Sequence, residues 1–250
     1  GIVVIGGLKR IAEVATFLVP LMGSIYFGAM LIALTLNLDQ VFPAFKLILV
    51  DAFNGTAIAG GTFFGVLIYG VRRGAFSNEA GMGTESLVHG VAKVSDPVKQ
   101  GLVAMTGPIF DTLIICTATA LMILISGVWE TSTSQGVTLT AEAFTMLLGN
   151  FGGFILFTCV ICFGLSTIFT YSYYGASCSR FLFDKFGMKF YIYLYIFSIF
   201  IFSIVPIDIA INIADGAFAM MAIPTLVSAL WLAPKVMQAS KNYFKLVDNN

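Results

Sequence analysis

Six long apolar runs divide the chain, and polar or charged segments separate them. The runs cover residues 11–36, 44–71, 100–128, 143–174, 188–205 and 208–233. Apolar residues are continuous within each run, whereas the strands of a transmembrane barrel alternate apolar and polar residues. The fifth run is rich in Tyr, Phe and Ile, which locally favours a strand. A lone strand in lipid would leave its backbone unpaired, so we predict a helix for every run.

Composition places these runs in a membrane. The chain has 250 residues, of which 58% are hydrophobic and 10% are charged, whereas an ordinary soluble domain has roughly 25% charged residues. We therefore predict an all-α integral membrane protein with six transmembrane helices in a single domain. The 13 basic residues balance the 13 acidic ones, which argues against a nucleic-acid partner because such proteins carry a basic excess.

The positions of the basic residues predict the orientation of the spans. If there are six spans, all 13 basic residues except Lys46 fall in segments on one side of the membrane. This asymmetry is typical of the cytoplasmic side. We therefore predict a multi-pass protein of the cell (inner) membrane, with both ends of the chain in the cytoplasm and lipid as its surroundings.

Motifs of enzymatic chemistry are scarce in the sequence. His89 is the single histidine, and Cys159 and Cys162 form a C-x-x-C pair without enough further ligands nearby for a metal. We therefore predict that the protein is not an enzyme and has no cofactor.

Two adjacent glycines lie near the middle of the second run. Gly60 and Gly61 stand about halfway between Lys46 and Arg72, and glycine costs about 1 kcal/mol against alanine inside a helix. Such a pair is typical of the broken helices of transporters, where unwound backbone faces a substrate or ion. Close packing of helices through small residues explains the pattern equally well.

Four carboxylates lie in or near the runs without an obvious basic partner. They are Glu13, Asp51, Asp111 and Asp215. An ionisable residue inside a membrane span suggests a function. The alternatives are a helix end near water, or a carboxylate that bonds to neighbouring backbone or hydroxyl groups.

Two further segments are candidates for function. Ser166 and Thr167 lie in the fourth run, where their oxygens suit a monovalent cation or bond back to the carbonyl of the preceding turn. The segment 72–86, RRGAFSNEAGMGTES, follows the second run. Its charged residues favour a cytoplasmic gate that makes and breaks ion pairs, although a solvated loop has the same composition.

Several motifs together resemble the sodium:alanine symporter family, whose members are alanine or glycine:cation symporters. The motifs are VRRGAFSNEAGMG (Val71–Gly83), GLKR (Gly7–Arg10), VPLM (Val19–Met22), AFNGTAIAGG (Ala52–Gly61), FDTLIICTATAL (Phe110–Leu121), FGLSTIFTYSYYG (Phe163–Gly175) and IADGAFAMMAIP (Ile213–Pro224). They occur in order along essentially the whole chain. Among the departures from the family pattern, Gly83-Thr84-Glu85 stands where Gly-Ser-Ala-Pro is usual, and Thr225 stands where Asn is usual.

The resemblance implies a leucine-transporter-type fold with inverted repeats, in which the six spans correspond to helices 5–10. The chain would then be the C-terminal portion of a longer transporter, and the second run would be a helix broken near residues 60–61. By the same resemblance, Phe53, Thr56, Gly60 and Gly61 are substrate-binding candidates, and Ser166 and Thr167 are candidates for a sodium site. The candidate gating or structural residues are Arg72, Arg73, Ser77, Asn78, Glu79, Asp111 and Asp215.

The function implied is symport of a small neutral amino acid, alanine or glycine, coupled to sodium and driven into the cell by alternating access. The partners are then the amino acid and sodium, with sodium as the coupling ion. A proton-coupled transporter of another small amino acid, a channel and a non-transporting scaffold are the alternatives.

Overall fold

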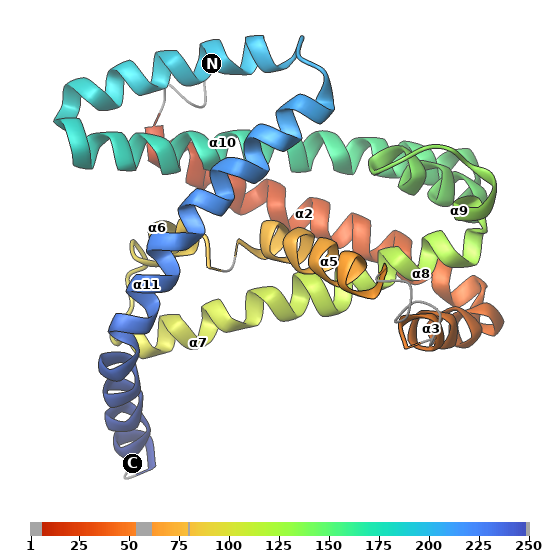
Figure 1. Ribbon diagram of the computed structural model, residues 1–250, viewed down its shortest axis with the longest axis horizontal. Coiled ribbons are helices and arrows are strands. Elements are labelled where there is room, and N and C mark those ends of the chain that lie inside the picture. Colours follow the sequence, from red (N-terminus) through yellow and green to blue (C-terminus); the bar gives the residue numbers. More distant parts are fainter. Residues whose placement is uncertain (1–6, 54–61, 80, 249–250) are drawn as a thin grey trace. The chain divides into compact units, whose positions relative to one another are not determined.

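A computed structural model describes residues 7–53, 62–79 and 81–248 (Figure 1). Within these ranges the regular elements are helices and no β-strand occurs, so the all-α prediction is confirmed for the described part. Four described segments are long and apolar enough to cross a membrane, as an integral membrane protein requires. They are Phe17–Leu36, Pro97–Ser126, Val137–Phe202 and Ile207–Val247.

The first three predicted runs correspond to helices in different ways. The first run lies within α2 (Gly7–Leu36). The second is shared between α3 (Leu38–Ala52) and α5 (Thr62–Asn78). The third covers most of a continuous stretch of helical elements. That stretch consists of α7 (Pro97–Pro108), the π-helical η1 (Ile109–Cys116) and α8 (Thr117–Ser126).

The last three predicted runs occupy two helices. The fourth lies within α10 (Val137–Phe202), and the fifth begins in α10 and extends past its end to residue 205. The backbone of α10 leaves helical geometry at Gly149, inside the fourth run, and at Phe183 and Asp184, between the two runs. The sixth lies within α11 (Ile207–Asp248). The division into six spans therefore stays a prediction.

The chain forms two compact units, of which the first comprises Gly1–Ile68 and Leu113–Tyr195. Its core joins α2, α8 and α10 through the fully buried side chains of Met30, Met122 and Phe144.

Tyr26 links the three helices of this first core. Its hydroxyl lies 2.9 Å from the Oγ1 of Thr119 on α8. Its ring stacks on Phe144 at 5.5 Å between centroids and meets the edge of Phe163 at 5.8 Å. A buried tyrosine needs a hydrogen-bond partner, and Thr119 provides one.

The second unit comprises Tyr69–Thr112 and Ile196–Asn250. It holds the end of α5, the short α6 (Thr84–His89), α7 and α11. The start of α7 is capped by Asp96, whose carboxylate accepts a 2.7 Å hydrogen bond from the backbone N–H of Val98. Pro97 occupies the first helical position, where no N–H is needed. Asp followed by Pro is a common sequence at such a helix start.

Pro108 stands where α7 passes into η1. Proline cannot donate the hydrogen bond to the preceding turn, and a π-helical segment is one way in which a helix accommodates such a loss. Asp111 lies in the first turn of this widened segment, and π-helical turns are frequent at functional sites.

Candidate functional site

The described gating candidates converge in the second unit, around the end of α5. Arg73 on α5 donates a 2.8 Å hydrogen bond from its Nη2 to the Oδ2 of Asp215 on α11. Arg72 lies 3.8 Å from the same carboxylate oxygen. The Asp215 side chain is 15% exposed and the Arg73 side chain 35%. Asp215, a carboxylate without an obvious partner in the sequence, therefore has two basic neighbours from a distant segment.

Two aromatic contacts support this ion pair. The guanidinium of Arg73 lies over the ring of Tyr69, 5.2 Å from its centroid, which is cation–π distance. One turn further along each helix, Phe76 meets Phe218 edge to face at 4.8 Å between ring centroids. Residues three apart share a helix face, so α5 and α11 meet along one stripe that carries an ion pair and then an aromatic pair.

The end of α5 also binds to η1. The Ser77 hydroxyl donates a 2.6 Å hydrogen bond to the Oδ2 of Asp111. The Asn78 amide donates a 3.2 Å hydrogen bond to the Oγ1 of Thr112. Two neighbouring residues at the end of α5 therefore pair with two neighbouring residues of η1. Asp111 has the hydroxyl partner that the sequence left open as one alternative.

The segment after α5 turns back onto α11. Glu79 has a positive φ of 55°, and its carbonyl accepts a 3.2 Å hydrogen bond from the N–H of Met82. Gly83 has a φ of +86°, and a Cβ at its position would lie 2.8 Å from the Oγ1 of Thr225. Thr225, a position that departs from the resembled family pattern, therefore lies against Gly83, the last residue of a motif that matches it.

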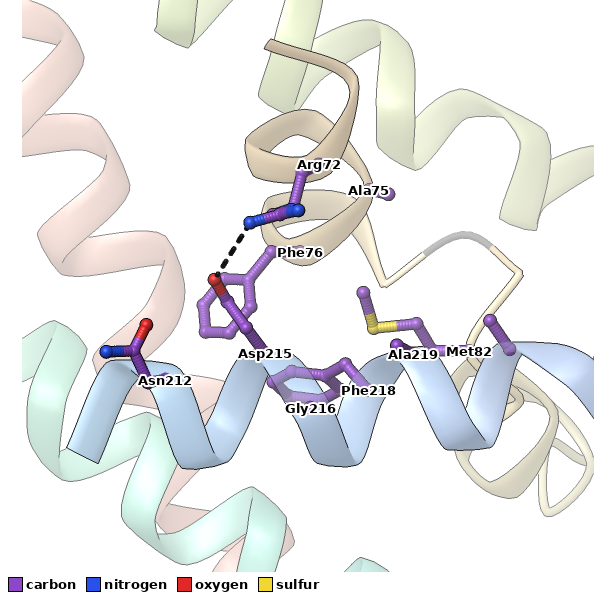
Figure 2. A pocket seen from close by; sticks show the side chains of 10 residues that line it. Arg72, Ala75, Phe76, Met82, Asn212, Asp215, Gly216, Phe218 and Ala219 are labelled. Atoms are coloured by element: carbon purple, nitrogen blue, oxygen red, sulfur yellow. Dashed lines mark ion pairs between the residues drawn. The ribbon is translucent and has the colours of Figure 1, made fainter. Parts of the chain in front are cut away.

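A cavity of about 410 Å³ lies between α5 and α11. Figure 2 shows Arg72 from α5 and Asp215 from α11 pointing toward each other at this cavity, with Asn212 one turn before Asp215. The other lining residues are apolar or small. They are Ala75, Phe76, Met82, Gly216, Phe218, Ala219 and Ala222.

The substrate-binding candidates lie mostly outside the described residues. Thr56, Gly60 and Gly61 belong to the range 54–61, which the structure does not describe. Phe53 follows the last residue of α3, and 72% of it is exposed.

The two sodium candidates differ in their surroundings. Ser166 on α10 is buried, and its hydroxyl donates a 2.9 Å hydrogen bond to the carbonyl of Phe163 in the same helix. The neighbouring Thr167 is exposed. Ser166 thus makes the local bond that was one of its two alternatives. Among the described residues, no group of three or more His, Cys, Asp or Glu side chains could hold a metal ion.

A sequence model described as the sodium:alanine symporter family matches residues 1–250. The chain belongs to the sodium:alanine symporter family. The family resemblance drawn from the motifs is therefore confirmed.

Curated relatives are similar to nearly the whole chain. It is 34% identical to the sodium/alanine symporter AgcS of Methanococcus maripaludis, over 99% of this chain and 55% of AgcS. It is 33% identical to the probable sodium/glutamine symporter GlnT of Bacillus subtilis, over 97% of this chain and 51% of GlnT. It is 29% identical to the sodium/proton-dependent alanine carrier protein of Bacillus sp. (strain PS3), over 97% of this chain and 59% of that carrier.

The chain spans about half the length of these curated relatives. They are named as symporters and carriers, so the prediction that this symporter-family chain is not an enzyme is confirmed.

Sequence reasoning did not find every residue of this family member's α5–α11 contact. Asn212, Phe218 and the small lining residues were missed because they read as ordinary residues of an apolar helix. One signal could have paired Arg73 with Asp215. An acidic residue inside an apolar run needs a partner, and the only adjacent arginines in the sequence are Arg72 and Arg73.

Proposed function

We propose that this chain is part of a secondary transporter that couples inward sodium flow to the uptake of a small neutral amino acid, alanine or glycine. The observation that carries this proposal is the family match over residues 1–250. A relative that is 34% identical over 99% of the chain is named as a sodium/alanine symporter. Coupling arises if sodium binding favours the state that binds the amino acid, and this linkage is reciprocal.

The proposed architecture is the leucine-transporter type, with the six spans as its helices 5–10 in the cell membrane and both ends of the chain in the cytoplasm. Two features of the described helices support it. The second run is shared between α3, which ends at Ala52, and α5, which begins at Thr62, and these ends bracket the predicted break. The backbone of α10 leaves helical geometry at Phe183 and Asp184, where a turn between the fourth and fifth spans is predicted.

In this proposal the amino acid binds at the break in the second span. Phe53 and Thr56 line its pocket, and the backbone of Gly60 and Gly61 faces it. A zwitterion suits such a site because a helix N-terminus favours its carboxylate and backbone carbonyls accept hydrogen bonds from its ammonium group.

Sodium binds at Ser166 and Thr167 on α10. Hydroxyl and carbonyl oxygens are suitable ligands for this hard cation. Ser166 is buried, as a helix position turned toward a site would be.

The gate is formed by α5 and the turn that follows it. The bonds of Arg73 to Asp215 and of Ser77 to Asp111 tie this segment to α11 and to η1. Rocking of one helix bundle against the rest, as in alternating access, has to break such contacts and form them again. The proposed gate also includes Arg72, Asn78 and Glu79, which belong to the same segment.

Two relatives support other choices of ion and cargo. One is named a sodium/proton-dependent alanine carrier protein, which favours a proton as an alternative coupling ion. Another is named a probable sodium/glutamine symporter, which favours a larger neutral amino acid as an alternative cargo.

Uptake of labelled alanine into proteoliposomes that hold the full-length transporter tests the proposal. An inward sodium gradient should concentrate alanine, whereas equal sodium on both sides should only equilibrate it, and an inward proton gradient without sodium should not drive it. Accumulation driven by a proton gradient alone would show that the coupling ion is a proton and not sodium. Saturable uptake that no gradient accelerates would contradict symport. An excess of unlabelled glycine or glutamine then ranks the cargoes.

A further inference from the structure

The cavity between α5 and α11 combines charges of both signs with small apolar walls. Its charged lining residues are Arg72 and Asp215, and Asn212 adds an amide one turn before Asp215. The rest of the lining is apolar or glycine, and Ala75, Gly216 and Ala219 leave room for a ligand.

The two charged lining residues and Arg73, which pairs with Asp215, together carry a net charge of +1. Arg73 and Asp215 pair at 2.8 Å, so Arg72 supplies the uncompensated charge. Its Nη1 atom lies 3.8 Å from the Oδ2 of Asp215, which is longer than a hydrogen bond. The Arg72 side chain is also 58% exposed. Its guanidinium can therefore bind a carboxylate by donating two parallel hydrogen bonds to it, the geometry that arginine favours.

The part of the cavity lined by Asp215 and Asn212 suits a cation. Arg73 occupies the Oδ2 of Asp215, and a carboxylate has a second oxygen with lone pairs of its own. The side-chain oxygen of Asn212 is a further acceptor, and residues 212 and 215 share a helix face because they are three apart. An ammonium group fits here, beside the carboxylate that Arg72 holds.

We propose that this cavity is a second binding site for the small zwitterionic amino acid, separate from the site at the break in the second span. Arg72 holds the carboxylate of the ligand, Asp215 and Asn212 hold its ammonium group, and Ala75 and Ala219 lie beside its short side chain. The identity of the ligand rests on the proposed function, since the charge pattern alone requires only a small zwitterion.

The position of this cavity suggests how binding there depends on sodium. The cavity lies against the second half of α5, at the end of the second run that is predicted to face the cytoplasm. Ser166 and Thr167 do not line this cavity, so binding here should not require sodium, in contrast to binding at the break.

Equilibrium binding of labelled alanine to the purified full-length transporter tests the proposal. In sodium-free buffer the wild type should retain a weak saturable component. Arg72→Gln, which removes the charge, and Ala219→Phe, which fills the cavity, should each weaken that component about tenfold or more. Both should keep the additional binding that sodium produces. Lys235→Gln, an exposed charge change on the same helix α11, should leave both components unchanged.

Two controls separate this site from the one at the break. Gly60→Leu should abolish the sodium-dependent component and preserve the sodium-free one. Propionate carries only the carboxylate and ethylamine only the ammonium group, so each should compete with alanine more weakly than glycine does. Competition by propionate as strong as that by glycine would overturn the zwitterion assignment.

The remaining outcomes are equally decisive. Absence of sodium-free binding in the wild type would overturn the proposal, as would a component that survives Ala219→Phe. If Arg72→Gln fails to fold, Ala219→Phe decides the question alone, because its sodium-dependent binding reports an intact protein. Failure of sodium-driven uptake by the wild type is a different result, and it would refute the proposed function while leaving the cavity site to be judged by sodium-free binding.

Discussion

Arg73 donates a 2.8 Å hydrogen bond to Asp215 and thereby joins α5 to the sixth apolar run. The two residues are 142 positions apart in the sequence. Asp215 is mostly buried, with 15% of its side chain exposed, and a buried carboxylate without a partner would carry a large desolvation cost. The pair therefore explains how an acidic residue is tolerated inside an apolar helix.

Asp215→Ala should destabilise the protein because it leaves Arg73 unpaired. We expect a loss on the order of 1–3 kcal/mol, with partial exposure of Arg73 keeping the value at the lower end. The apparent melting temperature of the full-length transporter in detergent measures it. Asp208→Ala removes an exposed carboxylate from the first turn of the same helix and is the matched control. Equal shifts for the two variants would contradict the account, whereas partial recovery in the charge swap Arg73→Asp with Asp215→Arg would strengthen it.

Gly83→Ala should be destabilising for two separable reasons. Its φ of +86° disfavours any side chain, by about 1–2 kcal/mol, and the new Cβ would lie 2.8 Å from the Oγ1 of Thr225. Thr225→Ala should therefore rescue only part of the loss in melting temperature. Gly74→Ala, in an α5 position with open space, should be neutral or slightly stabilising. Full rescue by Thr225→Ala would show that backbone strain at Gly83 contributes nothing.

Phe144→Ala and Phe157→Ala should differ although both lie on α10. Phe144 is 0% exposed within the core of the first unit, whereas Phe157 is 63% exposed. In lipid the hydrophobic effect does not drive helices together, so packing decides the cost. We expect about 3–5 kcal/mol for the cavity left by Phe144→Ala and little for Phe157→Ala. Thermal unfolding in detergent compares them, and equal melting temperatures would be evidence against the described core.

Thr167→Ala should weaken the sodium dependence of alanine uptake more than it weakens expression. Loss of one hydroxyl ligand should raise the sodium concentration for half-maximal uptake by about tenfold, since a ligand bond is worth on the order of 1.4 kcal/mol. Thr158→Ala is the control, because its exposed hydroxyl donates to the carbonyl of Phe154 on the same helix. An unchanged sodium curve in Thr167→Ala would remove this residue from the proposed sodium site.

Local features of the fold could be predicted because they depend on neighbours in the sequence. Asp96 and Pro97 predict a capped helix start, and the structure has it. Continuous apolar runs predict helices because lipid offers the backbone no other partners, and the described runs are helical.

The arrangement around Asp215 could not be predicted in the same way. The adjacent arginines at 72 and 73 are a general signal that a buried carboxylate has a partner, but they do not say which carboxylate they meet, since the pairing with Asp215 depends on how α5 and α11 pack. The π-helical segment after Pro108 was also missed, because its apolar sequence resembles an ordinary helix. The chemistry of the break at Gly60 and Gly61, which lie outside the described residues, stays a prediction.

Entry of radioactive sodium into proteoliposomes that hold the full-length transporter tests the central claim most directly, because coupling is reciprocal. At fixed membrane potential and a fixed sodium gradient, external alanine should accelerate sodium entry, and the acceleration should saturate at the alanine concentrations that saturate alanine uptake. An excess of a large acidic amino acid should have no effect. Sodium entry that is the same with and without alanine would contradict sodium-coupled symport.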